Sequence, residues 1–500
     1  MIEVDPNFRS TASHQESKFE RGRKTIGLFL GPVVFIVILS VPFSSLSPAA
    51  NNLAAVMCFV LVFWVTEAIP LPVTALLGPT LAVILGVTNV GEAFAPMANP
   101  LIFLFIGSFI LAQGLFVHRV NERIAYTVLS WKLIGARPTR ILLAYGAIAA
   151  FLSAWMSNTA TAAMLVPIGL SLLAFMESDN TVPRSYGTVL MLMTAYGCSL
   201  GGLATPVGTP PNLIAIGALE RELGFRLTFI DWMSFAVPIT LVMLAFIFVY
   251  LNAVGGVGVS EIPGAQKIIE KRKKDLGPWK TGERNAVIAF GLTVTLWMVP
   301  GLLPLFLGRE HPIVQTFLSS IPEAVAALVG VAVLFLLPVS RTQRSTITWK
   351  EAAQIDWGTI LLFGGGLSLG SMASSTGLAQ VFGLGVTGLL PTTSVVTLTF
   401  GAALFTLILS ETMSNSAATN IAVPIVISIA QAASVDPIAP ALAASLVASA
   451  AVVLPVSTPP NAIVYASGKV PITRMIRYGI AVDVFAVVVV PLMVLLLGPS

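Results

Sequence analysis

Ser157-Asn158-Thr159-Ala160 lies inside a long apolar stretch of this chain and is followed by Val166-Pro167-Ile168. The same pattern returns half a chain later as Ser414-Asn415-Ser416-Ala417 with Val423-Pro424-Ile425. A second motif is also doubled, as Pro206-Val207-Gly208-Thr209-Pro210-Pro211-Asn212 and Pro455-Val456-Ser457-Thr458-Pro459-Pro460-Asn461. Polar, helix-breaking residues inside a bilayer are tolerated only where they are buried in protein or line a watery cavity. Paired breaks in corresponding positions of two halves indicate the binding site of a secondary transporter.

The composition indicates a polytopic membrane protein. Hydrophobic residues make up 56% of the 500 residues and charged residues only 10%, and the mean hydropathy is +0.90. Soluble domains carry roughly 25% charged residues. The N-terminal segment 1–24 is polar and contains acids, so it does not resemble a cleavable signal peptide. Cys58 and Cys198 both fall in apolar segments, which excludes a disulfide framework or a thiol metal site.

The apolar runs divide the chain into about eleven spans and two re-entrant hairpins. The predicted spans are 26–43, 52–68, 71–88, 99–116, 185–218, 229–252, 285–304, 322–338, 357–378, 438–467 and 475–497, with hairpins at 141–176 and 394–432. With the N-terminus inside, 24 of the 27 Lys and Arg residues lie on the cytoplasmic side. This bias follows the positive-inside rule. The basic pI of about 9.1 therefore reflects topology, and an odd number of spans places the C-terminus outside the inner membrane.

The charged stretch 254–284 separates two halves. We expect a cytoplasmic tail at 1–25, a first half at 26–253 with hairpin 141–176 and broken helix 185–218, and the cytoplasmic linker 254–284. The second half, 285–500, contains hairpin 394–432 and broken helix 438–467. Each half has five spans once the first span is set aside. Because five is odd, the two halves have inverted topology, and the tips of their hairpins are expected to meet near the midplane.

The doubled breaks contain the parts of both a cation site and an anion site. Proline breaks the hydrogen-bond ladder and frees carbonyl oxygens for a cation, while a restarted helix offers N–H groups and a positive dipole end to an anion. Neither hairpin nor either broken helix contains Lys, Arg or His. A dianion would therefore need co-bound cations for neutralisation, and oxygen-only ligands suit sodium. Titratable carboxylates suited to proton coupling are sparse, with Glu67 and Glu411 the main candidates.

These four motifs, in this order and spacing, resemble the divalent anion/sodium symporter family of INDY-type carboxylate transporters from about residue 26 onward. The resemblance implies an all-α elevator-type transporter with a scaffold domain and a moving transport domain, usually a homodimer. It implies a first sodium site of Ser153, Ser157, Asn158 and Gly208 and a second of Ser410, Met413, Asn415 and Ser457. Carboxylate contacts are expected from Asn158, Thr159, Thr209, Asn415, Ser416, Thr458 and Pro459.

The expected function is sodium-coupled transport of C4-dicarboxylates such as succinate, malate or fumarate, without an organic cofactor or nucleic acid. Ser416 stands where the family pattern has threonine, which leaves the substrate open. The family also contains sodium-independent dicarboxylate exchangers and carriers of citrate or sulfate, and these remain alternatives. An intramembrane enzyme would need a paired nucleophile and base, and Asp231, Asp356 and Asp483 are interpreted as isolated and peripheral. Asn212 and Asn461 are expected to brace the broken helices.

Overall fold

The computed structural model describes residues 6–41, 43–134, 137–178, 184–255, 265–308, 310–340, 345–387, 394–455 and 457–499. These residues form helices and connecting loops, with no β-strand among them. The first half begins with α1 (Pro6–Ser40), α2 (Pro48–Thr66), α3 (Leu71–Ile84), α4 (Val90–Phe94), η1 (Ala95–Ala98), α5 (Pro100–Val117) and α6 (Val120–Leu129). It continues with α7 (Pro138–Ser153), α8 (Asn158–Ser178), α9 (Arg184–Gly201), η2 (Gly202–Ala204), α10 (Pro210–Leu223) and α11 (Phe229–Gly255).

The second half repeats this order after the linker helix α12 (Ala265–Asp275). Its first helices in chain order are α13 (Thr281–Leu307), α14 (Pro312–Ser320), α15 (Glu323–Leu336), α16 (Trp349–Ala352), α17 (Trp357–Ser375) and α18 (Leu378–Thr387). The remaining helices are α19 (Val395–Thr412), α20 (Asn415–Ala432), α21 (Ile438–Ala450), α22 (Pro459–Ala466) and α23 (Ile472–Leu497). The doubled motifs therefore fall at the α7–α8, α19–α20, α9–α10 and α21–α22 breaks.

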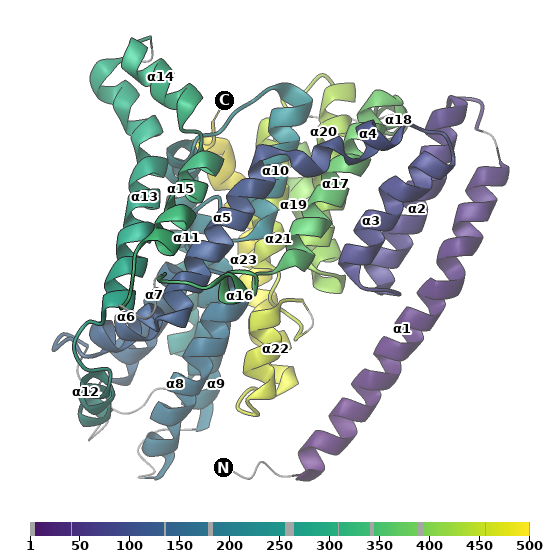
Figure 1. The fold of residues 1–500 in the computed structure, drawn as a ribbon. Coiled ribbons are helices and arrows are strands. Elements are labelled where there is room, and N and C mark those ends of the chain that lie inside the picture. The colour runs from purple at the N-terminus through teal and green to yellow at the C-terminus, as the bar shows by residue number, and fades with distance from the viewer. Residues whose placement is uncertain are drawn as a thin grey trace.

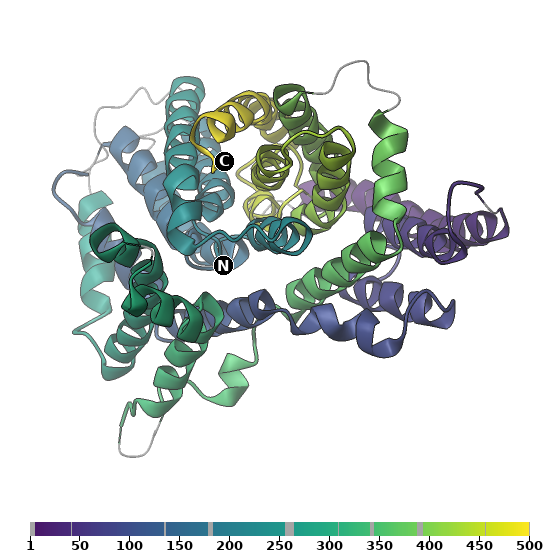
Figure 2. The ribbon, with the colours of Figure 1, turned by 90° about the horizontal axis from the view of Figure 1, so that it is seen from above.

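The two halves are inverted relative to each other. In Figure 1, α7 and α8 lie in the lower part of the molecule, while α19 and α20 lie in the upper part. The broken helices show the opposite order, with α10 above and α22 below. Seen from above, the yellow-green helices of the second half lie beside the blue helices of the first (Figure 2), and α9 contacts both α21 and α22.

Length and composition separate long spans from broken ones. Among the described residues, eight helices are long and apolar enough to cross a membrane, and α14 with α15, bent by 65°, would be a ninth. One of the eight is α19, an arm of the predicted hairpin 394–432. The predicted spans 71–88 and 438–467 contain only shorter helices, α3 with 14 residues and α21 with 13. The expected count of eleven therefore includes short and broken helices.

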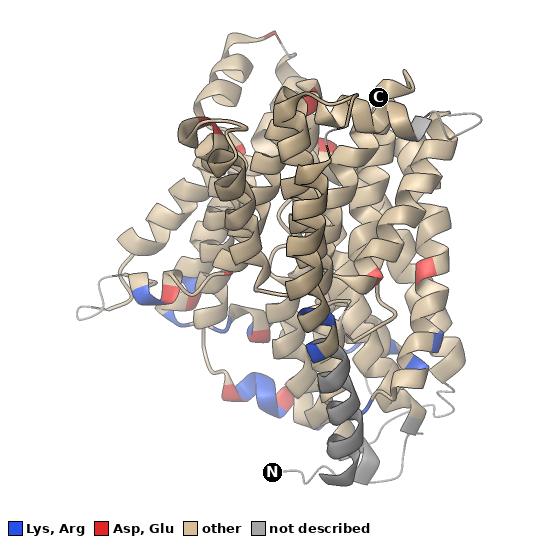
Figure 3. Ribbon diagram, turned by 90° about the vertical axis from the view of Figure 1, so that its right-hand side faces the viewer, with Lys and Arg blue, Asp and Glu red and all other residues tan. Residues whose placement is uncertain are grey.

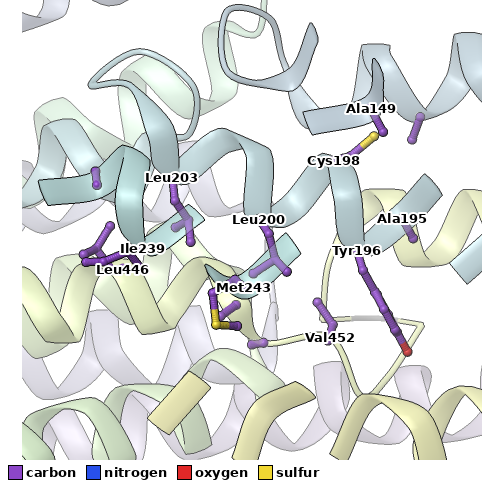
Figure 4. Packing of buried hydrophobic residues seen from close by; sticks show 14 of the residues in the cluster. Ala149, Ala195, Tyr196, Cys198, Leu200, Leu203, Ile239, Met243, Leu446 and Val452 are labelled. Carbon is purple, nitrogen blue, oxygen red and sulfur yellow. The ribbon is translucent and has the colours of Figure 1, made fainter. Parts of the chain in front are cut away.

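The core is formed around α9. In the most apolar 18-residue stretch of this helix, 94% of the residues are buried. In the corresponding stretch of α1, which lies at the edge of the molecule (Figure 1), only 11% are buried. Among its buried polar side chains, Thr194 Oγ1 of α9 donates to the Leu190 carbonyl oxygen at 2.8 Å, as buried polar groups require. Figure 4 shows side chains of α9, of α11 and of the second half in one cluster, with labelled residues Tyr196, Cys198, Leu200, Ile239, Met243, Leu446 and Val452. This packing joins the two halves into one body around the broken helices.

Charged residues lie mainly at the ends of the molecule. The Lys and Arg residues that are visible in Figure 3 lie in the lower half, at the end where α1 begins, while Asp and Glu residues are seen in both halves. α23 ends at the opposite end from the start of α1 (Figure 1). Termini at opposite ends are the arrangement that an odd number of crossings requires, and the orientation of the termini across the membrane stays a prediction.

Candidate functional site

The two hairpin tips share one side-chain contact, although α19 continues to Thr412, two residues beyond the position equivalent to Ser153. The first break separates Ser153, the last residue of α7, from Asn158, the first of α8, and the second separates α19 from Asn415, the first residue of α20. Across each break a serine hydroxyl meets the asparagine side chain. Ser153 Oγ lies 2.5 Å from Asn158 Oδ1, and Ser410 Oγ lies 2.8 Å from Asn415 Oδ1. The asparagines are therefore fixed by their own hairpins.

The two broken helices are braced by equivalent asparagines. Asn212 Nδ2 donates to the carbonyl oxygens of Gly202 and Thr205 at 2.9 and 2.8 Å. Asn461 Nδ2 donates to those of Val452 and Leu454 at 2.9 and 3.0 Å. Both side chains are fully buried. The expectation that these asparagines brace the breaks is confirmed.

A cavity of about 300 Å³ lies where these four elements meet. Every predicted carboxylate contact lines it, namely Asn158, Thr159, Thr209, Asn415, Ser416, Thr458 and Pro459, together with the predicted sodium ligands Ser157, Gly208 and Ser457. The first residues of α8, α10, α20 and α22 are all in this lining. Four helix N-termini therefore converge on one cavity, and their positive dipole ends favour an anion. Helices α10 and α22 each begin with two prolines, which lack N–H groups, so free N–H groups come mainly from α8 and α20.

The cavity wall contains one charged residue among those described, and it is an acid. Lys, Arg and His are absent from this lining, as the sequence predicted. Asp356, the N-cap of α17, accepts hydrogen bonds from Thr359 N at 3.1 Å and Thr359 Oγ1 at 2.6 Å. The interpretation of Asp356 as peripheral was wrong. Sequence reasoning missed it because α17 carries none of the doubled motifs and reaches the cavity only through tertiary packing.

The first predicted sodium site is a cluster of oxygen atoms. The Asn158 amide nitrogen donates to the carbonyl oxygens of both Gly208 and Cys198 at 3.2 Å and to Ser153 Oγ at 2.5 Å. Its neighbours Ser153, Gly208 and Cys198 thus place a hydroxyl and two carbonyl oxygens around one side chain. Oxygen-only ligand sets are typical of hard cations. The Cys198 carbonyl was not predicted, because a backbone atom carries no sequence signal.

The second predicted sodium site differs in its neighbours. Ser410 Oγ, besides contacting Asn415, lies 2.7 Å from the Ala448 carbonyl oxygen. Met413 is buried at the end of α19 in an extended conformation, with φ −145° and ψ −178°. Ser457 Oγ donates to Glu411 at 2.6 Å. A carboxylate thus stands directly behind this site, whereas Ala154 occupies the equivalent position in the first half.

Two further acids of the spans have defined partners. Asp483 on α23 is 6% exposed and accepts from Val452 N at 3.2 Å, beside Glu411, so its interpretation as isolated and peripheral was also wrong. Glu67 forms an ion pair with Arg23 at 3.1 Å. This contact gives Glu67 a packing role between α1 and the α2–α3 connection.

A second hollow of about 420 Å³ adjoins the cavity. The two share Phe109, Ser157, Thr159 and Asp356, and the hollow extends along α5 to Phe116. That end of α5 leads to the loop predicted to be cytoplasmic. The candidate site is therefore continuous with a space on the side of the molecule where the Lys and Arg residues gather (Figure 3).

Known proteins that are similar to this chain are transporters. The sodium-dependent dicarboxylate transporter of Staphylococcus saprophyticus is 32% identical over 98% of this chain and 94% of its own length. That of Staphylococcus aureus strain USA300 is 31% identical over 97% and 93%. The crystal structure of the Alcanivorax borkumensis YdaH transporter shares the fold, with a TM-score of 0.55, 14% identity and coverage of 82% of this chain and 88% of that one. The family described as the sodium:sulfate symporter transmembrane region matches residues 23–499. The chain belongs to this family of divalent anion/sodium symporters.

Proposed function

We propose that this protein carries C4-dicarboxylates such as succinate, malate or fumarate across the inner membrane together with sodium. The observation that carries the proposal is the convergence of four helix N-termini on one cavity lined by no Lys, Arg or His among the described residues. Such a cavity attracts an anion through dipoles and neutral donors alone. Its volume of about 300 Å³ is at the small end for ligand sites and suits a short dicarboxylate.

Sodium coupling is supported by the oxygen clusters on either side of this cavity. Asn158 belongs to both the first cluster and the anion-binding wall, and Asn415 holds the equivalent place in the second half. Sodium bound among these oxygen atoms would turn the Asn158 amide, so that its oxygen faces the cation and its nitrogen faces the substrate. The two related transporters named as sodium-dependent dicarboxylate carriers support the same assignment.

The proposed mechanism is an elevator. Sodium binds first and fixes the hairpin tips, the dianion then docks on the Asn, Thr and Ser groups, and the loaded transport domain moves against the scaffold. Hairpins α7–α8 and α19–α20 and the broken helices form the transport domain in this proposal, and α17 with Asp356 belongs to the scaffold. The continuity of the cavity with the hollow beside α5 supports an inward-facing state.

Uptake of labelled succinate into proteoliposomes tests this function. An inward sodium gradient is compared with choline, with and without internal succinate, for the parent protein and for Asn158→Ala and Asn415→Ala. We expect sodium-driven uptake by the parent and its loss in both variants, because each removes a side chain shared by cation and anion. Uptake that ignores sodium but requires internal dicarboxylate would identify an exchanger, and absence of succinate uptake would direct the assay to citrate and sulfate.

A further inference from the structure

The two predicted cation sites differ at one pair of equivalent positions. Ser457 and Gly208 each precede Thr-Pro-Pro-Asn, so they correspond to each other. Glu411 and Ala154 each follow the hairpin serine, Ser410 or Ser153, and also correspond. The second half therefore has a hydroxyl and a carboxylate where the first half has neither.

In the first half there is no room for a hydroxyl. A Cβ atom on Gly208 would lie 2.5 Å from the Gly202 carbonyl oxygen and 3.0 Å from that of Ala154. Both distances are far inside van der Waals contact with backbone atoms that cannot move aside easily. This site therefore offers the Gly208 backbone carbonyl, whose orientation needs no side-chain support.

In the second half the hydroxyl of Ser457 is held in one orientation. Ser457 Oγ donates its proton to Glu411 Oε2 at 2.6 Å and accepts from Leu454 N at 3.2 Å. A hydroxyl has one proton and two lone pairs. The Ser457 hydroxyl uses its proton in the hydrogen bond to Glu411 and one lone pair in the hydrogen bond from Leu454 N. Its other lone pair is free to bind a cation. Ser457 also lines the cavity, so its hydroxyl lies next to the candidate site.

Glu411 is itself fixed by the loop that it supports. Its carboxylate accepts from Val453 N at 2.9 Å and from Leu454 N at 3.3 Å in addition to Ser457. Asp483 accepts from the preceding amide, Val452 N, at 3.2 Å. The two acids thus hold consecutive amides of one loop, and Glu411 is the acid that is bonded to the hydroxyl.

We propose that Glu411 is a positioning residue for the second cation site, where it orients the Ser457 hydroxyl as a sodium ligand. Groups behind a metal ligand commonly orient it and raise its basicity. This inference rests on the proposed sodium coupling. It makes the two sites chemically unequal, since the first uses a backbone carbonyl and the second a side-chain oxygen backed by a carboxylate.

A double-mutant comparison tests the inference. Sodium titrations of succinate uptake are made for Glu411→Gln, Ser457→Ala and the double variant, and succinate titrations are made at saturating sodium. Glu411→Gln replaces the carboxylate by an amide. The NH₂ group of this amide cannot accept a hydrogen bond from Ser457 Oγ, whereas its oxygen can still accept from the loop amides. We expect this variant to raise the half-saturating sodium concentration about tenfold, the low end of the range seen for groups behind metal ligands. The half-saturating succinate concentration at saturating sodium should stay within about twofold of the parent value, because the change acts on the cation ligand.

The decisive result is the dependence of this shift on Ser457. In the Ser457→Ala background, Glu411→Gln should add no further shift, because the hydroxyl that it orients is gone. The matched control Asp436→Asn changes an acid that accepts from a different loop amide, Ile438 N at 2.9 Å, so its effect should be the same in both backgrounds. Equal shifts from Glu411→Gln with and without Ser457, or no shift at all, would overturn the inference.

A second measurement applies to variants that are inserted into the membrane too poorly for transport assays. Stabilisation of the detergent-solubilised protein by sodium, relative to choline, reports cation binding without transport. Ser457→Ala should reduce this stabilisation and Ser457→Thr, which keeps the hydroxyl, should retain it. Equal stabilisation of both variants would also overturn the inference. A parent protein without sodium-dependent uptake or stabilisation would instead refute the proposed function itself, so the two failures are distinguishable.

Discussion

Asn212 and Asn461 hold the same position in the two halves, and each donates both side-chain N–H groups to carbonyl oxygens of the loop before its own helix. The four distances lie between 2.8 and 3.0 Å. A helix broken inside a membrane exposes carbonyl groups that water cannot reach. The asparagines satisfy these groups, which allows the breaks to persist at the depth of the site.

Replacing either asparagine should therefore destabilise the protein. Asn461→Ala leaves two buried carbonyl oxygens without their donor, and an unsatisfied buried group costs about 1–3 kcal/mol. Asn461→Asp is expected to be at least as harmful, because it places two acceptors against the carbonyls. Thermal unfolding in detergent measures both. A variant that unfolds at the parent temperature would show that the brace contributes nothing.

Gly208→Ala should abolish transport without removing any polar group. Its Cβ would lie 2.5 Å from the Gly202 carbonyl oxygen, so the first loop must shift and its carbonyl would leave the cluster around Asn158. Gly291→Ala on α13 is the matched control, since a Cβ there meets no atom within 4 Å. We expect sodium-driven uptake to fall below about a tenth of the parent rate for Gly208→Ala, the effect of about 1.4 kcal/mol in the barrier, and to remain at the parent rate for Gly291→Ala.

Asp356→Asn should strengthen substrate binding. Asp356 is the charged residue on the described wall of an anion cavity, and removing its charge removes repulsion worth about 1 kcal/mol for a nearby dianion in a watery site. Asparagine caps a helix as well as aspartate does, so α17 should keep its start. We expect a lowering of the half-saturating succinate concentration by a factor of about three to five, from the same energy. The lowering should shrink at high salt, as screening requires. An increase in that concentration would show that the carboxylate has another role.

Arg123→Ala should be among the most destabilising changes away from the site. Arg123 pairs with Glu283 at 3.0 Å, with side chains only 9% and 5% exposed, and also donates to carbonyl oxygens of the linker at Leu276 and Gly277. Breaking a buried pair leaves an unpaired charge and costs about 3–5 kcal/mol. The comparison is Arg226→Ala, whose pair with Glu220 is mostly solvent-exposed on the arginine side and should contribute at most about 1 kcal/mol. Denaturation midpoints of the two variants measure the difference, and equal midpoints would contradict it.

The doubled motifs predicted which chain segments form the site. Because Ser-Asn and Thr-Pro-Pro-Asn segments break the apolar helices of both halves, the sequence was sufficient to predict the breaks, the inverted halves and seven residues that line one cavity. Their contact with a carboxylate stays a prediction. It was less reliable for span length. The hairpin arm α19 has the length and hydropathy of a full span, while α3 and α21 do not, because packing inside the protein relaxes the requirement that each helix match the bilayer.

Local sequence determined the helices, their breaks and the neutrality of the site, since these depend on residue types within a few positions of one another. The tertiary structure alone decided the contacts made at long range. Asp356 reaches the cavity through α17, the Cys198 carbonyl joins the oxygen cluster, and Glu411 meets Ser457 forty-six residues along the chain. Such contacts depend on how whole helices pack, and no local pattern records the position of a backbone oxygen or the partner of a single acid.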